Sequence, residues 1–72
     1  MHPADIKAQM EKKGITQTYL GQVLGVSQVS VSRVIHKKNI SDRIMRRIAQ
    51  EIDMLPEEVF PEYYLQARRR AS

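Results

Sequence analysis

Residues 17–36 read QTYLGQVLGVSQVSVSRVIH and contain two short helical patterns separated by a tight turn. In the first pattern Leu20, Val23 and Leu24 lie three and four residues apart, so a helix places all three on one face. Gly25 follows where the chain must leave that helix with a positive φ, which glycine adopts without a Cβ clash. The first pattern therefore predicts a helix that ends at this glycine.

The second pattern begins after Ser27, whose hydroxyl is suited to cap a helix by accepting a free backbone N–H. Val31, Val34 and Ile35 then repeat at helical spacing and predict a buried face. Glutamine and arginine on the opposite side indicate that this side of the helix is not buried. The side chains that this periodicity turns outward, free to touch a partner, are Gln28, Val29, Ser32 and Arg33.

Gly21 sits in the middle of the first helix, where glycine costs roughly 1 kcal/mol relative to alanine. A second helix that crosses close by would explain its presence. Val26 is placed to fill the angle between the two helices, and Thr16 is placed to cap the first one. Any helical hairpin has such caps, but the combined spacing of the glycines and the apolar residues predicts a helix-turn-helix.

Over roughly residues 5–60 the sequence resembles the lambda-repressor-like, Cro-type DNA-binding domains of phage and bacterial regulators, above all at GVSQ (25–28) and VIH (34–36). Two terminal stretches, HPADI (2–6) and LPEEVFPEYY (55–64), resemble instead the ends of the Ner-like regulators of Mu-type phages. Both resemblances imply a small all-helical DNA-binding protein, and the second implies one that represses or modulates transcription. Because the second helix of the motif is closer to Cro, a Ner-specific operator is not implied.

Length and composition narrow the class of protein. A chain of 72 residues makes one domain, near the lower limit for a core that folds without staples. There is no cysteine, and His2 and His36 are far apart, so neither a disulfide nor a metal or other cofactor is expected. No apolar run approaches the roughly 20 residues that span a bilayer, and the N-terminus lacks the apolar segment of a signal peptide. We expect a cytoplasmic protein without a membrane partner or a small-molecule substrate.

Charge is distributed unevenly along the chain. The net charge is +4, but residues 28–47 hold six basic residues and one acidic residue, a local +5. Residues 48–62 hold five acidic residues and no basic one, a local −5. Most charge runs are solvated helix surfaces. Here the positive block coincides with the second helix of the motif and the segment after it, which favours a nucleic-acid-binding face.

Further helices flank the motif. Residues 2–5 (HPAD) form a helix start, because proline is tolerated in the first turn and an acid is favourable at the positive end of the helix dipole. Ile6 and Met10 share one face of this helix and are its expected core contacts. The helix is expected to run to Lys13 and to end at Gly14.

Beyond the motif, Ser41 is the expected cap of a fourth helix. Its broad apolar stripe consists of Ile44, Met45, Ile48, Ala49 and Ile52. Residues 56–60 begin with proline and two glutamates and predict a short fifth helix, with Val59 and Phe60 in the core. Together these patterns predict an all-α bundle of four to five short helices.

Pro61 cannot continue the fifth helix, so we expect one helix-turn-helix domain at residues 1–61 and a partly flexible tail at residues 62–72. One domain of this size contacts only a few base pairs, which favours a homodimer on a near-palindromic operator. The leading candidates for its pairing surface are Phe60, Tyr63, Tyr64 and Leu65.

A DNA-binding function places residues 28–36 in the major groove of double-stranded DNA, whose width admits one α-helix. By resemblance to Cro-type domains, Gln28 is expected to read a base, and its amide suits adenine. Arg33 suits guanine or a phosphate, Val29 suits a thymine methyl group, and Ser32 is able to donate or accept. The residues expected at the DNA phosphates are Gln17, Thr18, Tyr19, Ser27, Lys37, Lys38 and Arg43.

Other function classes are weaker fits. An enzyme is not expected, because the sequence contains no obvious carboxylate pair, activated nucleophile, metal cluster or phosphate-binding glycine loop. A protein-interaction module of the same fold, docking a transcription component or a toxin, is the main alternative, and the acidic residues 51–62 would form its surface. RNA binding ranks third, because the surface aromatic pattern of single-strand binders is missing.

Overall fold

Over residues 1–64, which the computed structural model describes, the chain forms helices and no strand. The helices are α1 (Pro3–Lys12), α2 (Gln17–Leu24), α3 (Gln28–Ile35), α4 (Asp42–Glu51) and α5 (Pro56–Val59), and residues 61–64 are helical as well. The predicted all-α fold is confirmed. The predicted end of the first helix is one residue too late, because Lys13 is the C-cap of α1.

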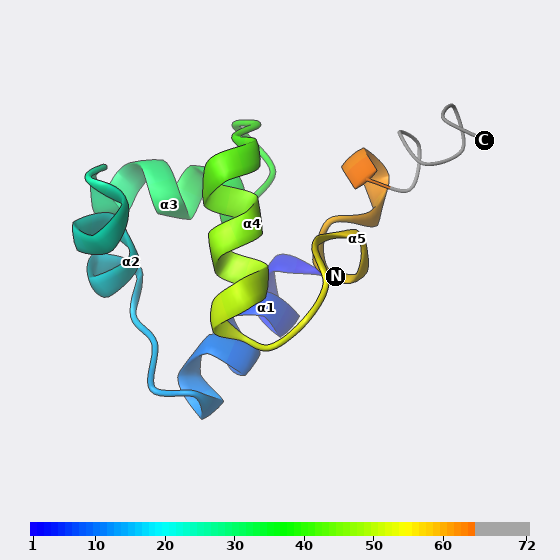
Figure 1. Ribbon diagram of the computed structural model, residues 1–72, viewed down its shortest axis with the longest axis horizontal. Coiled ribbons are helices and arrows are strands. Elements are labelled where there is room, and N and C mark those ends of the chain that lie inside the picture. The colour runs from blue at the N-terminus through cyan, green and yellow to red at the C-terminus, as the bar shows by residue number, and fades with distance from the viewer. Residues whose placement is uncertain (65–72) are drawn as a thin grey trace.

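The helix α4 lies in the middle of the fold, with α2 and α3 on one side and α1 and α5 toward the other (Figure 1). It packs against α2, α3 and α5, and α2 packs against α3. The start of the chain lies beside α5, where the amino group of Met1 donates to the carbonyl oxygen of Val59 over 2.8 Å. The α2–α3 pair is therefore carried on a scaffold of three other helices.

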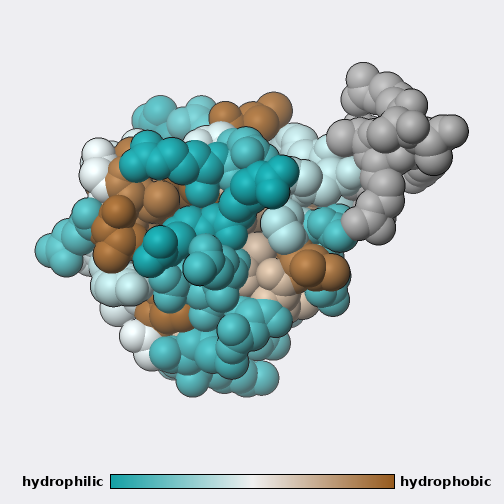
Figure 2. Space-filling model, in the orientation of Figure 1, coloured by the Kyte–Doolittle hydropathy of each residue, from teal (hydrophilic) through white to brown (hydrophobic). Residues whose placement is uncertain are grey.

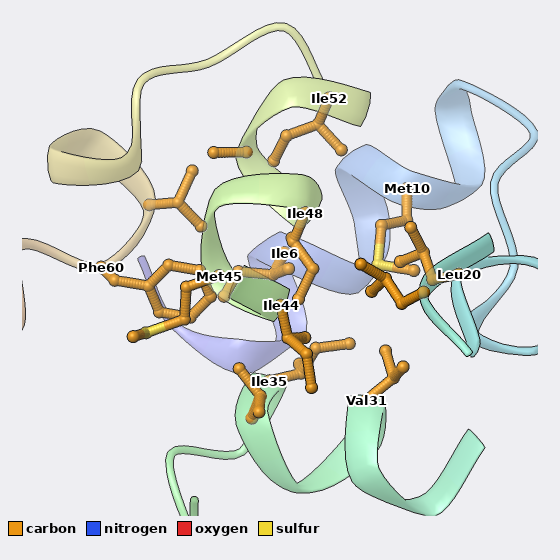
Figure 3. Close-up of a cluster of buried hydrophobic side chains, with 14 residues drawn as sticks. Ile6, Met10, Leu20, Val31, Ile35, Ile44, Met45, Ile48, Ile52 and Phe60 are labelled. Atoms are coloured by element: carbon orange, nitrogen blue, oxygen red, sulfur yellow. The ribbon is translucent and has the colours of Figure 1, made fainter. Parts of the chain in front are cut away.

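The hydrophobic core takes side chains from all five helices. It contains nearly every residue expected there: Ile6, Met10, Leu20, Leu24, Val31, Val34, Ile35, Ile44, Met45, Ile48, Ala49, Ile52, Val59 and Phe60. Figure 3 shows Val31 and Ile35 of α3 near Ile44 of α4. Burial of these apolar groups is the main favourable contribution to folding and fixes which face of α3 turns inward.

Val23 departs from the predicted face of α2, because 44% of its surface is exposed. A helix turns about 100° per residue, so Val23 and Gly21 lie on opposite sides of Leu20. Gly21 is buried, which turns its side of α2 toward the interior and the side of Val23 toward solvent. The rotation of α2 about its axis, rather than the apolar spacing alone, decides which of its residues are buried.

The packed helices continue beyond the predicted boundary at residue 61. Tyr63 and Tyr64 pack against the core, and the Tyr64 hydroxyl donates to Asp42 at the start of α4 over 2.5 Å. Phe60 is fully buried, so it is not available for the pairing surface predicted for a dimer. Leu65 and the rest of the expected tail lie outside the described residues.

Candidate nucleic-acid interface

Two caps and a glycine build the α2–α3 pair. The Thr16 hydroxyl accepts the Tyr19 N–H over 3.0 Å, and the Ser27 hydroxyl accepts the Ser30 N–H over 3.2 Å. Gly25 ends α2 with a φ of 71°, in the left-handed region that favours glycine. Both predicted caps and the predicted end of the first motif helix are confirmed.

Gly21 lies where α2 comes close to the segment leading into α3. A Cβ at this position would lie 2.7 Å from the carbonyl oxygen of Val26 and 3.4 Å from the backbone nitrogen of Gln28. A contact with backbone atoms is not relieved by rotating a side chain. The absence of a side chain therefore allows the predicted close crossing, and the crossing fixes how α3 is presented.

The helix α3 has one buried and one exposed face. Val31, Val34 and Ile35 are at most 1% exposed. The four predicted base-reading residues lie on other sides of the helix: Gln28, Val29 and Arg33 are exposed and Ser32 is half-buried. Val29 leaves 58% of its surface open on this face. This face thus offers hydrogen-bonding groups beside an apolar one.

The surface around α2 and α3 is mixed in character. In Figure 2, isolated apolar areas interrupt a largely hydrophilic surface, including one on the left, where α2 and α3 lie. The exposed large hydrophobic residues are Tyr19, Val23, Val29, Ile40 and Leu55. Single exposed apolar residues are common on proteins, so it is their position on a helix face that gives them meaning here.

The start of α2 carries three predicted phosphate contacts. Thr18 and Tyr19 are exposed and Gln17 is half-buried. The free N–H groups at a helix start attract anions, although the Thr16 cap already occupies one of them. Tyr19 has a partner on α4, because it joins Glu51 in raising the pKa of the Arg47 guanidinium.

Two other predicted phosphate contacts bind groups within the protein. Arg43 donates to the backbone carbonyl of Leu24 at the end of α2. The Lys37 ammonium lies 2.6 Å from the Glu62 carboxylate. Burial opposes ionisation of Glu62, yet Lys37 brings the pKa of this carboxyl below its ordinary value. Lys37 and Arg43 therefore have structural roles that the charge pattern did not predict.

A second cluster joins α4 to residues 61–64. Arg46 Nε donates to both carboxylate oxygens of Asp42, at 2.9 and 2.8 Å, and its guanidinium lies 5.5 Å from the centre of the Tyr64 ring. Hydrogen bonds from Tyr64 and Arg46 hold the pKa of Asp42 below its ordinary value. Burial and the Asp42 carboxylate raise the pKa of Tyr64 to about 12. The only sequence signal for this cluster was the four-residue spacing of Asp42 and Arg46.

Arg33 and Lys38 differ from the other basic residues of the positive block. The side chain of neither residue has a hydrogen-bond or ion-pair partner among residues 1–64. Together with Ser32 and His36 they line a hollow of about 270 Å³ at the C-terminal end of α3. Unpaired positive charge therefore gathers at one end of the exposed helix.

His36 links α3 to α1. Its Nε2 atom lies 3.0 Å from Lys7 Nζ, and its Nδ1 atom lies 3.0 Å from the carbonyl oxygen of Ser32. No sequence signal pairs Lys7 with His36, because 29 positions separate the two residues. The other histidine, His2, caps α1 by accepting the Ala4 N–H, a role that the helix-start pattern also missed.

Residues 1–64 contain no group of three or more histidine, cysteine or acidic side chains placed to hold a metal. None of the helices in the same range is long and apolar enough to cross a membrane.

One comparison with known proteins gives a match. A family described as winged helix-turn-helix DNA-binding matches residues 1–72, which is the whole chain. No curated protein and no solved structure matches. Within the described residues the motif helices are not accompanied by strands. The match confirms the predicted helix-turn-helix DNA-binding class, and the narrower Cro-type and Ner-like resemblances stay predictions.

Proposed function

We propose that this chain, which belongs to the winged helix-turn-helix DNA-binding family, is a sequence-specific regulator of transcription that places α3 in the major groove of double-stranded DNA. The observation that carries the proposal is the exposed face of α3, where Gln28, Val29 and Arg33 project from a helix whose opposite face is buried. The major groove shows each base pair a distinct pattern of donors, acceptors and methyl groups. A helix with this mixture of side chains is suited to distinguish them.

Each exposed side chain of α3 has a proposed partner. The Gln28 amide pairs with the acceptor and donor of adenine, and the Arg33 guanidinium makes two hydrogen bonds to guanine or holds a phosphate. Val29 packs on a thymine methyl group, and Ser32 adds a hydroxyl at the edge of the contact. A good two-bond contact discriminates against the wrong base by about 1–3 kcal/mol.

The proposed phosphate contacts surround this face. Gln17, Thr18 and Tyr19 lie at the start of α2, where such domains commonly meet the DNA backbone. The set is completed by Ser27, Lys37, Lys38 and Arg43. Of these, the Lys38 ammonium has no partner within the protein among residues 1–64. These contacts add affinity for any sequence and orient α3 in the groove.

The resemblances suggest a narrower identity. The likeness of residues 25–36 to Cro-type domains, and that of both chain ends to Ner-like regulators, favour a repressor of the phage or prophage kind. Regulation of this type requires access to DNA in the cytoplasm. A homodimer on a near-palindromic site would supply the contacts that one domain lacks, with half-sites one helical turn apart. Sedimentation of the protein alone and with its selected DNA tests this part, and a monomer in both would remove it.

The alternative of a protein-interaction module has less support. Its proposed surface was the acidic segment 51–62, but Glu51 binds Arg47, Asp53 binds Lys13 and Glu62 binds Lys37. Carboxylates that already have cationic partners attract a basic protein less strongly. Within the described residues, the side chains on the exposed face of α3 form no ion pair of this kind.

Selection from a random pool of duplex DNA tests the proposed function. We expect enrichment of a defined site, and a palindrome in that site would set the half-site spacing of a dimer. A double variant, Gln28→Ala with Arg33→Ala, should lose this site, whereas Gln22→Ala, which changes an exposed glutamine on α2, should keep it. Retention of all sequences alike, without enrichment, would contradict sequence-specific regulation.

A further inference from the structure

We propose that the hollow at the C-terminal end of α3 binds one phosphodiester group of the DNA backbone and that a proton on His36 strengthens this binding. The assignment depends on the proposed DNA-binding function and extends it to α1. The residues proposed to hold the phosphate are Lys7, Arg33, His36 and Lys38.

The charges around the hollow favour an anion. Within residues 1–64 the side chains of Arg33 and Lys38 line it without an internal partner, and its lining contains no carboxylate. Elsewhere in the positive block a phosphate would have to displace an existing bond, such as that between Lys37 and Glu62. Guanidinium and ammonium groups donate strong hydrogen bonds to phosphate oxygens. The hollow is therefore the place where a phosphate forms the most new hydrogen bonds and breaks the fewest existing bonds.

The geometry of His36 defines its neutral form. An ammonium group only donates hydrogen bonds, and a carbonyl oxygen only accepts them. With Lys7 Nζ 3.0 Å from Nε2 and the Ser32 carbonyl oxygen 3.0 Å from Nδ1, the neutral ring carries its hydrogen on Nδ1. Its Nε2 lone pair then accepts from Lys7.

Protonation of His36 changes this contact. A hydrogen on Nε2 would face the Lys7 ammonium, so two like-charged donors would oppose each other across 3.0 Å. The other charged groups at the hollow, Arg33 on α3 and Lys38 in the following loop, are positive as well. A phosphate seated among them accepts hydrogen bonds from several and offsets their repulsion. DNA binding therefore favours the protonated ring, and affinity rises as the pH falls.

The pH dependence of DNA affinity tests the role of His36. Binding of a short mixed-sequence duplex is measured by fluorescence anisotropy at fixed ionic strength, from about pH 8 to about pH 5.5, the range in which imidazole changes charge. We expect affinity to rise by about five- to tenfold, the effect of one added phosphate contact near 0.1 M salt, and His36→Gln to abolish the rise. The control His2→Asn changes the other histidine, keeps a capping side chain on α1, and should leave the rise unchanged.

Variants of Lys7 test the contribution of α1. Lys7→Gln should weaken duplex binding by about five- to tenfold and reduce the slope of log affinity against log salt by about 1. Lys7→Arg should retain most of the affinity. Lys12 is also exposed on α1, but the contact with His36 is made by Lys7, so Lys12→Gln should have a smaller effect.

Two results would overturn the assignment while DNA binding persists: a pH response that survives in His36→Gln, or equal losses in Lys7→Gln and Lys12→Gln. Circular dichroism of each variant verifies that it is folded. Failure of the intact chain to bind any duplex at any pH would overturn the proposed function itself, and this site with it.

Discussion

The helix α3 with its following loop and the helix α4 are both rich in basic residues, but those residues have different surroundings. On α4 every arginine has an internal partner, whether a carboxylate or a backbone carbonyl: Arg43, Arg46 and Arg47. At the end of α3, the side chains of Arg33 and Lys38 have no such partner among residues 1–64. The density of positive charge in the sequence is similar for both regions. What distinguishes a candidate interface from a scaffold is whether the charge is already paired.

The physical basis of this difference is the electrostatic potential outside the molecule. An exposed ion pair contributes about 0–1 kcal/mol to stability, and the field of its cation is largely cancelled nearby. Unpaired cations on one helix end add their fields and attract a polyanion. By this criterion α4 holds α2 and residues 61–64 in place, and α3 carries the surface that we propose binds DNA.

The largest effect is expected from a substitution that moves α3 relative to α4. Gly21→Ala would place a Cβ 2.7 Å from the Val26 carbonyl, so we expect a loss of about 1–3 kcal/mol in the free energy of unfolding and weaker DNA binding. Urea unfolding measures the stability. Gln22→Ala, next to it and exposed, should be close to neutral. An alanine variant as stable as the original chain would show that this contact does not hold the motif together.

A direct test exchanges one arginine from each region. Arg33→Ala should cost about 1–3 kcal/mol of binding free energy to a selected duplex, roughly five- to 150-fold in affinity. Arg46→Ala removes the same charge from α4 and should change that affinity far less, because the charge is already paired with Asp42. Anisotropy titrations at one salt concentration give both values. Equal losses would mean that internal pairing does not separate the two regions.

Lys37 lies in the loop after α3 but, like the arginines of α4, has an internal partner. The variant Glu62→Gln removes the charge of that partner and tests what the pairing does. Removing the Glu62 charge frees the Lys37 ammonium for a phosphate, so duplex affinity should rise by about two- to fivefold and its salt dependence should steepen. Glu11→Gln makes the same change of charge on α1 and is the matched control. If affinity falls in Glu62→Gln, then Glu62 positions Lys37 rather than competing for it.

The smallest effect is expected at the Asp42 cluster, as a dependence of stability on pH. The native pKa of Asp42 lies below its ordinary value of 3.8, so ionised Asp42 stabilises the fold above that pH. This contribution disappears as the pH falls through the native pKa. Tyr64→Phe should lower the melting temperature slightly at neutral pH and leave it unchanged in strong acid, since Asp42 is exposed. A difference that is constant with pH would point to lost packing of Tyr64 alone.

Local signals in the sequence were sufficient for most of the fold. Thr16 and Ser27 are recognisable as caps because a cap needs only a hydroxyl and the next few N–H groups. The buried faces of α1, α3, α4 and α5 follow from the spacing of their apolar residues. Val23 was misplaced because spacing defines an apolar stripe but not the rotation of a short helix against its neighbours.

In the candidate site, too, some features follow from the sequence and others only from the packing of the helices. The sequence by itself determined that a helix begins at Gln28 with Gln28, Val29 and Arg33 turned outward, because helical periodicity and burial depend on residues only a few positions apart. The predicted end of this helix at residue 36 was one residue too late, because His36 is the C-cap of α3. Only the tertiary structure decided which charges are paired: Lys37 meets Glu62, Tyr64 meets Asp42 across 22 positions, and Lys7 meets His36 across 29. Composition specifies how many charges a chain carries, but the distances between residues remote in sequence arise only when the helices pack.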